Sequence, residues 1–270
     1  MSAAAAPRPL PDPQWIRPAW PVPDTVQALI TTRAGGVSRG PWGAADGADG
    51  MNLGEGSDDP QAVAANRARL RTLLPADPCW LEQVHGSVVV DAARAPGRPR
   101  ADAAFATRAA VVCCVLVADC LPVLLAEING RGVAAAHAGW RGLAGGVIQN
   151  TVNALRRGLD DPGARIVAYL GPAIGPERFE VGPEVLEAMR RLLPDAQQAF
   201  TPQCGGKYRA DLYALATQAL ARVGVGDVHG GGWCTVGDAR RFYSFRRESP
   251  TGRQAALIWR KPGAAEGAER

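Results

Sequence analysis

The chain has 270 residues, 47% apolar and 21% charged, a balance that allows a substantial core in one or two domains. Its net charge of +4, from 30 basic and 26 acidic residues, is spread along the chain without the dense basic patch of a nucleic-acid-binding protein. No segment approaches the run of ~18 apolar residues that a membrane helix needs. The opening MSAAAAPRPLPDPQW also lacks the features of a signal peptide. We therefore expect a cytoplasmic protein that binds neither nucleic acid nor membrane, with its cysteines reduced.

The two ends of the chain have the composition of solvated termini, so we expect disordered segments over residues 1–14 and 261–270 and one domain over residues 15–260. Apolar or alternating patterns bounded by turn residues predict strands at residues 25–32, 87–91, 110–117, 122–127, 132–137, 165–170 and 241–245. Helical periodicity predicts helices at residues 59–74, 141–158, 183–193 and 210–223. Because helices and strands do not alternate strictly, this order favours an α+β fold with mixed sheets.

Asn129-Gly130 lies between two apolar strands and strongly favours a hairpin turn. With that turn, the numbers of facing residues sum to 259, so His137 faces Pro122 and lies diagonally from Cys120. Diagonal neighbours on one face of a hairpin have Cβ atoms about 7 Å apart or less, within reach of one ion. A thiolate and an imidazole in this arrangement are typical zinc ligands.

A third ligand must come from elsewhere, and the chain has only three histidines, His85, His137 and His229. His85 lies before a glycine and an apolar strand, whereas His229 lies in the glycine-rich segment GDVHGGGW. His85, Cys120 and His137 with an open fourth position would form a catalytic zinc site. Alternatively, Cys120 is a nucleophile and His137 its base, which leaves His85 without a role. Both residue types also occur as ordinary buried packing.

Several polar residues are candidates for binding a substrate. Arg33 precedes two glycines whose backbone can form an anion-binding nest. A helix that starts near Arg141 would point its N-terminus toward the metal, and Arg246 follows the predicted strand 241–245. Asn52 could contact a substrate through its amide, and Asp119 beside Cys120 could move a proton, although a regular strand would point it to the opposite face. Ordinary turn chemistry and solvated arginines explain these patterns equally well.

Nine segments spread from Trp15 to Trp259 form a distinctive set: TTRAGGVS, MNLGEGSDDP, WLEQVHG, ADAAFAT, ADCLPVLLAE, AAAHAGWRGLAGGVI, YLGPAIGPERFEVG, GKYRADL and FYSFRRESPTGRQAALIW. With these segments the chain resembles the laccase-domain, or polyphenol-oxidase-type, family. The resemblance implies a single domain folded as a four-layer α/β/β/α sandwich. It also implies a Zn²⁺ ion held by His85, Cys120 and His137, which would serve as the catalytic residues.

The same resemblance implies a purine nucleoside phosphorylase that acts on adenosine, inosine, guanosine and methylthioadenosine, with adenosine deaminase activity. The expected partners are these nucleosides and inorganic phosphate, held by Arg33, Asn52, Arg141 and Arg246 in a monomer or weak homo-oligomer. Two alternatives are a copper-dependent polyphenol oxidase with Cu²⁺ in the site and a Cys–His hydrolase of cell-wall nucleotide precursors. The oxidase is less favoured, because a multicopper enzyme needs many more histidines than three.

Overall fold

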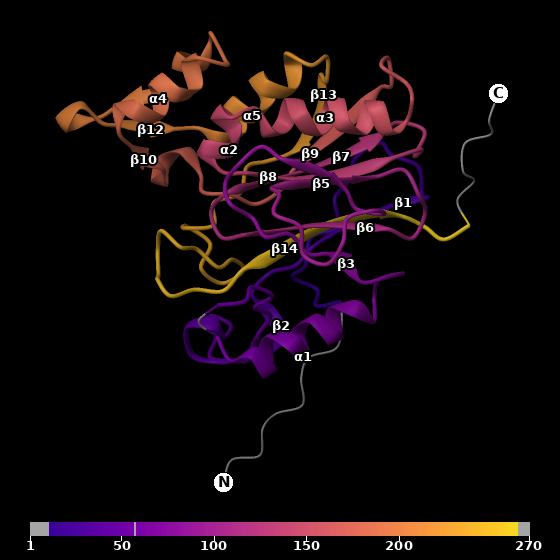
Figure 1. The fold of residues 1–270 in the computed structure, drawn as a ribbon. Coiled ribbons are helices and arrows are strands. Elements are labelled where there is room, and N and C mark those ends of the chain that lie inside the picture. Colours follow the sequence, from indigo (N-terminus) through magenta and orange to yellow (C-terminus); the bar gives the residue numbers. More distant parts are fainter. Residues whose placement is uncertain (1–10, 57, 264–270) are drawn as a thin grey trace.

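The computed structural model describes residues 11–56 and 58–263, which form four layers in the order helices, sheet, sheet, helix (Figure 1). The six-stranded sheet has the order β13 (Asp227–Gly230), β9 (Ile166–Leu170), β7 (Leu121–Glu127), β8 (Val133–Ala138), β5 (Ala103–Ala106) and β4 (Val89–Asp91). The four-stranded sheet has the order β1 (Val26–Ile30), β14 (Gln254–Arg260), β6 (Val112–Val117) and β3 (Pro78–Cys79). The α+β sandwich expected from the sequence is therefore confirmed.

Helices cover the outer face of each sheet. Four helices lie over the six-stranded sheet: α2 (Trp140–Ala144), α3 (Val147–Gly158), α4 (Pro183–Arg190) and α5 (Leu212–Ala221). They are joined there by a small sheet of β10 (Glu180–Val181), β12 (Tyr208–Ala210) and β11 (Phe200–Pro202). Helix α1 (Pro60–Arg71) lies beneath the four-stranded sheet, beside β2 (Ala34–Ser38) (Figure 1).

Three apolar cores separate the four layers, one between each pair. Strand β7 contributes to two of them: Leu121, Val123 and Leu125 face the upper helices, whereas Leu124 and Ala126 face the other sheet. Because both faces of this strand are buried, its sequence is continuously apolar rather than alternating. Strand β8 carries three consecutive alanines, whose small side chains suit the tightly packed interior between layers.

The hairpin formed by β7 and β8 has the register expected from its turn. Pro122 pairs with His137, and every other pair of this ladder also sums to 259. The turn is closed by a hydrogen bond from the Gly130 N–H to the Glu127 carbonyl at 2.7 Å. Asp59 caps α1, because its carboxylate accepts a hydrogen bond from the Gln61 N–H at 2.9 Å.

Two expectations differ from the structure. Residues 241–245 form turns instead of a strand, while the apolar segment of β14 lies between β1 and β6 at the centre of its sheet. The helix expected over residues 141–158 is interrupted at Gly145 and Gly146, the latter with a φ of 81°, and becomes the separate helices α2 and α3. Residues 1–10 and 264–270 of the two expected disordered termini lie outside the described part of the chain. No helix in residues 11–56 or 58–263 is long and apolar enough to cross a membrane.

Candidate metal centre and its cavity

Cys120 lies where the chain passes from one sheet to the other. Strand β6 of the four-stranded sheet ends at Val117, and β7 of the six-stranded sheet begins at Leu121. The three residues between them turn sharply, and Asp119 adopts a left-handed φ of 90°. Cys120 is therefore a turn residue at the entrance of β7 rather than a strand residue, but it still reaches His137 of β8 as the register predicted.

His85 lies in the connection between β3 and β4 and has a left-handed φ of 59°. This conformation is unfavourable for a residue with a Cβ atom and persists only where the surroundings impose it. The buried carboxylate of Asp102 provides that restraint by accepting hydrogen bonds from three successive N–H groups, those of Val84 at 3.2 Å, His85 at 2.9 Å and Gly86 at 2.7 Å.

The same carboxylate orients the second imidazole. Asp102 Oδ1 lies 2.8 Å from Nδ1 of His137, and both side chains are buried. A histidine whose Nδ1 is bound to a carboxylate presents Nε2 for coordination, an arrangement common in metalloproteins. Asp102 thus holds the backbone of one expected ligand and the ring of another.

The expected ligand atoms of His85, Cys120 and His137 lie within 4.8 Å of one another. The Cys120 sulfur is 3.8 Å from His85 Nε2, close to the ~3.5 Å that separates two ligands of a tetrahedral zinc ion. Gly139 leaves the space around them open, because a Cβ atom there would lie 2.8 Å from the Cys120 sulfur. One sulfur and two nitrogen donors around such a gap fit a borderline-soft divalent cation.

The protonation of Cys120 and His137 is shifted in a way that suits a bound cation. Burial acts to raise the pKa of the Cys120 thiol, but interactions with His137 and His85 lower it below its ordinary value. Burial acts to lower the pKa of His137, but the hydrogen bond with Asp102 and the neighbouring Cys120 raise it. The thiolate form is the one that binds metals. A divalent cation at this position would replace the positive charge that protonated imidazole otherwise supplies.

The centre opens into a cavity of about 570 Å³. Its walls come from both sheets and from the loops that follow them: Gly54, Glu55, Leu81, Gln83, His85, Arg98, Leu116, Val117, Ala118, Asp119, Cys120, His137, Gly139, Trp140, Arg141, Ile174, Phe179, Leu212, Phe245, Arg246 and Arg253. Phe245 is 58% exposed although it is a large apolar residue. An exposed aromatic ring beside a metal centre provides a face on which a planar ligand can stack.

Two of the arginines expected to bind substrate line this cavity. Arg141 lies in α2, with its guanidinium 4.4 Å from the ring centroid of Trp140. Arg246 lies in the turn after residues 241–245, and its backbone N–H donates a hydrogen bond to Asp119 at 2.6 Å. Asp119 also accepts a hydrogen bond from Thr235 at 2.6 Å, so its carboxylate anchors this C-terminal turn instead of pointing to a substrate.

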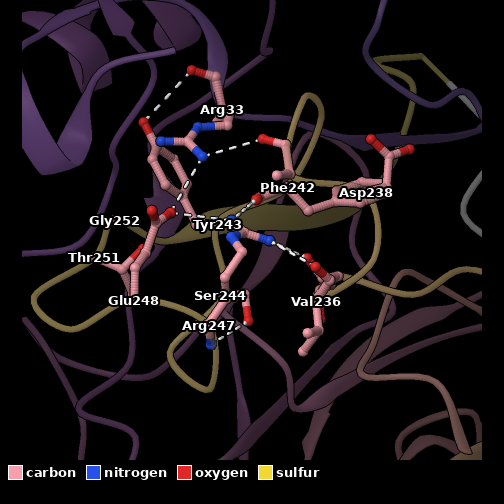
Figure 2. Close-up of polar contacts among 12 residues, drawn as sticks. Arg33, Val236, Asp238, Phe242, Tyr243, Ser244, Arg247, Glu248, Thr251 and Gly252 are labelled. Carbon is pink, nitrogen blue, oxygen red and sulfur yellow. Dashed lines mark hydrogen bonds and ion pairs between the residues drawn. The ribbon is translucent and has the colours of Figure 1, made fainter. Parts of the chain in front are cut away.

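Arg33 does not line the cavity. Its guanidinium lies over Tyr243 and beside Glu248 instead (Figure 2), and these surroundings do not support the expectation that it binds phosphate. Its side chain is 5% exposed and donates to the carbonyls of Gly43 at 2.9 and 3.1 Å and Ala239 at 3.1 Å, as well as to Glu248 at 3.1 Å. Arg247 also donates to Glu248, at 3.0 Å. The donors of Arg33 are thus occupied within the protein, where they fasten the turn that carries Phe245 and Arg246.

Asn52 is also absent from the cavity wall. Its buried amide bonds to Gly54 and Asp58 and accepts a hydrogen bond from the backbone N–H of Arg253 at 2.9 Å. His229 lies on the edge strand β13, where its ring is 2.6 Å from the Asp227 carboxylate, away from the other two histidines.

Four residues of this region were not identified from the sequence: Asp102, Gly139, Phe245 and Arg253. Their partners lie far away in the chain, 35 residues for Asp102 and His137 and 201 residues for Arg253 and Asn52. All four residues belong to segments of the distinctive set, but no local pattern indicated their roles.

Comparison with known proteins identifies the family. The sequence profile of the family described as multi-copper polyphenol oxidoreductase laccase matches residues 27–261. The chain belongs to this family. It is 49% identical over 248 residues to a purine nucleoside phosphorylase of Pseudomonas aeruginosa, covering 91% of this chain and 98% of that protein. It is 48% identical to the purine nucleoside phosphorylase YfiH of Escherichia coli, covering 90% of this chain and 98% of that protein.

Solved structures of family members have the same fold. A protein of Neisseria meningitidis superposes with a TM-score of 0.84 at 47% identity and covers 92% of this chain and 99% of its own. YlmD from Geobacillus stearothermophilus superposes with a TM-score of 0.80 at 30% identity and covers 92% of this chain and 96% of its own.

The role of Asp102 predicts that Asp102→Asn weakens metal binding. The amide keeps the shape of the side chain but not the charge that orients His137 and the turn at His85, so we expect metal affinity to fall about 10–100-fold. Competition with a chromophoric chelator measures this change. Glu127→Gln, which alters a buried carboxylate at the other end of the same hairpin, should leave the affinity unchanged. Equal affinities for Asp102→Asn and the unaltered protein would contradict this role.

The surroundings of Arg33 predict a loss of stability and not of phosphate affinity in Arg33→Met. The change leaves buried carbonyls and one carboxylate oxygen without their donor, which should lower the free energy of unfolding by about 2–3 kcal/mol. Urea denaturation measures it. The more exposed Arg241, paired with Asp238, is the control. Arg241→Met should lower the free energy of unfolding by less than about 1 kcal/mol. Unchanged stability together with a raised KM for phosphate would restore Arg33 as an anion ligand.

Proposed function

We propose that this protein is a zinc-dependent purine nucleoside phosphorylase with adenosine deaminase activity. The observation that carries the proposal is one cavity in which a His–Cys–His group, an exposed phenylalanine ring and several arginines meet. A nucleoside and phosphate require a planar surface and cationic groups, and the cavity offers both. The activity named for relatives up to 49% identical over nearly their whole length supports the same assignment.

Phosphorolysis forms a bond between a phosphate oxygen and C1′ of the ribose and breaks the bond from C1′ to the purine nitrogen. The electron pair of the broken bond leaves with the base, which takes up a proton. Phe245 would stack on the purine, while Arg141 and Arg246 would offset the charge of the phosphate. A zinc ion held by His85, Cys120 and His137 would supply Lewis acidity close to the base.

Deamination of adenosine could use the same cavity, because it acts on the purine ring rather than the ribose. Water adds at C6 of the purine and ammonia leaves, giving inosine. Zinc suits the donor set better than copper, because one thiolate and two imidazoles form a common tetrahedral zinc site and neither reaction transfers electrons.

The two alternative functions are supported less well. A cysteine nucleophile with His137 as its base leaves His85 without a role, yet the Cys120 sulfur lies 3.8 Å from the His85 ring nitrogen. Multicopper oxidation needs several metal centres, and the chain has three histidines, of which His229 lies apart from the others. Within the described residues, His85, Cys120 and His137 form the single group of three or more possible metal ligands.

The metal assignment predicts the effect of removing each ligand. His85→Ala, Cys120→Ala and His137→Ala should each lose zinc, measured by elemental analysis of the purified protein, and lose activity with it. His229→Ala should keep both, because its ring is bound to Asp227 on an edge strand. Chelation should abolish activity and added Zn²⁺ should restore it. Full activity after verified removal of the metal would disprove the assignment and favour the cysteine nucleophile.

The phosphorylase assignment predicts that base release depends on phosphate. Inosine should give hypoxanthine and ribose 1-phosphate when phosphate is supplied and should remain intact without it. Adenosine in phosphate-free buffer should give inosine and ammonia but no free adenine. Chromatography of the products distinguishes these outcomes. If base release is equally fast without phosphate and the second product is free ribose, the enzyme is a hydrolase and the proposal is wrong.

A further inference from the structure

Arg253 stands immediately before β14, and its position is set by a segment from the other end of the chain. Its backbone N–H donates to the buried amide oxygen of Asn52 at 2.9 Å. Its aliphatic stem passes beside Gly54, where an added Cβ atom would lie 2.6 Å from Cγ and 3.0 Å from Cβ of the arginine. Asn52 and Gly54 therefore hold Arg253 against the cavity wall, which both Gly54 and Arg253 line.

The guanidinium of Arg253 has no anionic partner among the described residues and lies 5.9 Å from the ring centroid of Phe245. Nη1 donates to the carbonyls of Thr251 at 3.3 Å and Gly252 at 3.0 Å, but Nε and Nη2 bond to no described residue. No ion pair within the described chain includes Arg253. Arg33, which is more deeply buried, is paired with Glu248. Arginine stays protonated in proteins, so this half-buried guanidinium offers free, positively charged donors to an anion that enters the cavity.

The nearby acidic groups do not fill this role. Asp119 is committed to Thr235 and the backbone of Arg246, and Cys120 belongs to the metal centre. Glu55, on the same wall, is paired with Arg67 and Arg98. Burial also lowers the pKa of Arg253, although Cys120 and Asp119 oppose this effect. Arg253 is therefore, with Arg141 and Arg246, one of three guanidinium groups on the cavity wall that form no ion pair within the described chain, and it is the one that Asn52 and Gly54 hold in place.

We infer that Arg253 is the principal ligand of the phosphate group in this cavity, assisted by Arg141 and Arg246, and that Asn52 and Gly54 are the residues that position it. The inference rests on the proposed function and deepens it by naming the anion site. A guanidinium presents its donors in a planar fork that matches two phosphate oxygens. The phosphate could be inorganic or part of a nucleotide, since the contacts to a terminal phosphate group are the same.

Steady-state kinetics of the zinc-loaded full chain test the inference first. Arg253→Gln should raise the KM for inorganic phosphate about tenfold or more, because charged hydrogen bonds are lost. The KM for inosine should change less than about twofold, and the zinc content should not change. Arg98→Gln is the matched control, since it removes a guanidinium from the same cavity wall that is already paired with Glu55. It should leave the KM for phosphate unchanged.

Gly54→Ala provides a second variant that removes no polar group. The added methyl group displaces the stem of Arg253, so the KM for phosphate should rise while circular dichroism and the melting temperature show a folded protein. Arg253→Lys should recover part of the affinity, because it restores the charge but not the fork. A role of Arg253 in folding alone would shift the melting temperature and leave the KM for phosphate where it was.

Calorimetric titration with inorganic phosphate and with a nucleoside 5′-monophosphate separates the two sources. If inorganic phosphate binds the unaltered protein and binding weakens at least tenfold in Arg253→Gln, the inference holds even where no base release is found, and only the proposed activity fails. If only the nucleotide binds, and its binding weakens in Arg253→Gln, the assignment of Arg253 as the anion ligand is supported and the phosphate is part of the substrate. Equal phosphate affinity and equal KM in the unaltered protein and Arg253→Gln would overturn the inference.

Discussion

The candidate metal centre depends on the carboxylate of Asp102. This single buried group accepts three backbone N–H groups around His85 and holds the ring of His137. The left-handed backbone at His85 costs on the order of 1 kcal/mol or more and persists because these hydrogen bonds offset it. Burying a charge on Asp102 is in turn tolerable only with that full set of donors, which together keep its pKa below the ordinary value although burial opposes them. Ligand geometry and carboxylate burial thus require each other.

The site also depends on the stacking of the two sheets. Cys120 is supplied by the turn that joins β6 of one sheet to β7 of the other, and His137 is supplied by β8. The opposite wall of the cavity comes from the turn before β14, which Asp119 fastens through the backbone of Arg246. Neither sheet alone contains both the ligands and the cationic wall. Changes that loosen the core between the sheets should therefore disturb the site even where they lie far from it.

Local patterns predicted the parts of this protein that local interactions determine. The hairpin register follows from Asn129-Gly130 and the period of two along a strand, and this register places Cys120 beside His137. The helix after Arg141 could not be predicted as two pieces, because two adjacent glycines are tolerated or not according to the packing around them. The segment Arg241–Phe245 alternates like a strand in sequence, but in the structure Phe242, Tyr243 and Ser244 are buried in succession and only Phe245 is exposed. No local pattern indicates the role of Asp102, because its hydrogen-bond partners come from other segments of the chain.

The two arginines Arg33 and Arg253 show why long-range pairing decides function. Arg33 follows a strand of the four-stranded sheet and Arg253 precedes one, and sequence patterns favoured Arg33 because Gly35 and Gly36 come shortly after it. In the folded chain, Glu248 and three hydrogen bonds to carbonyl oxygens occupy Arg33, and its charge is used to hold a turn. Arg253 is instead supported through its backbone and its stem, by Asn52 and Gly54, and its charged group is left with free donors. A protein stabilises a buried arginine by pairing its charge, and it prepares one for a ligand by fixing everything except that charge. The MNLGEG segment is therefore best understood as the support of an anion site rather than as the site itself.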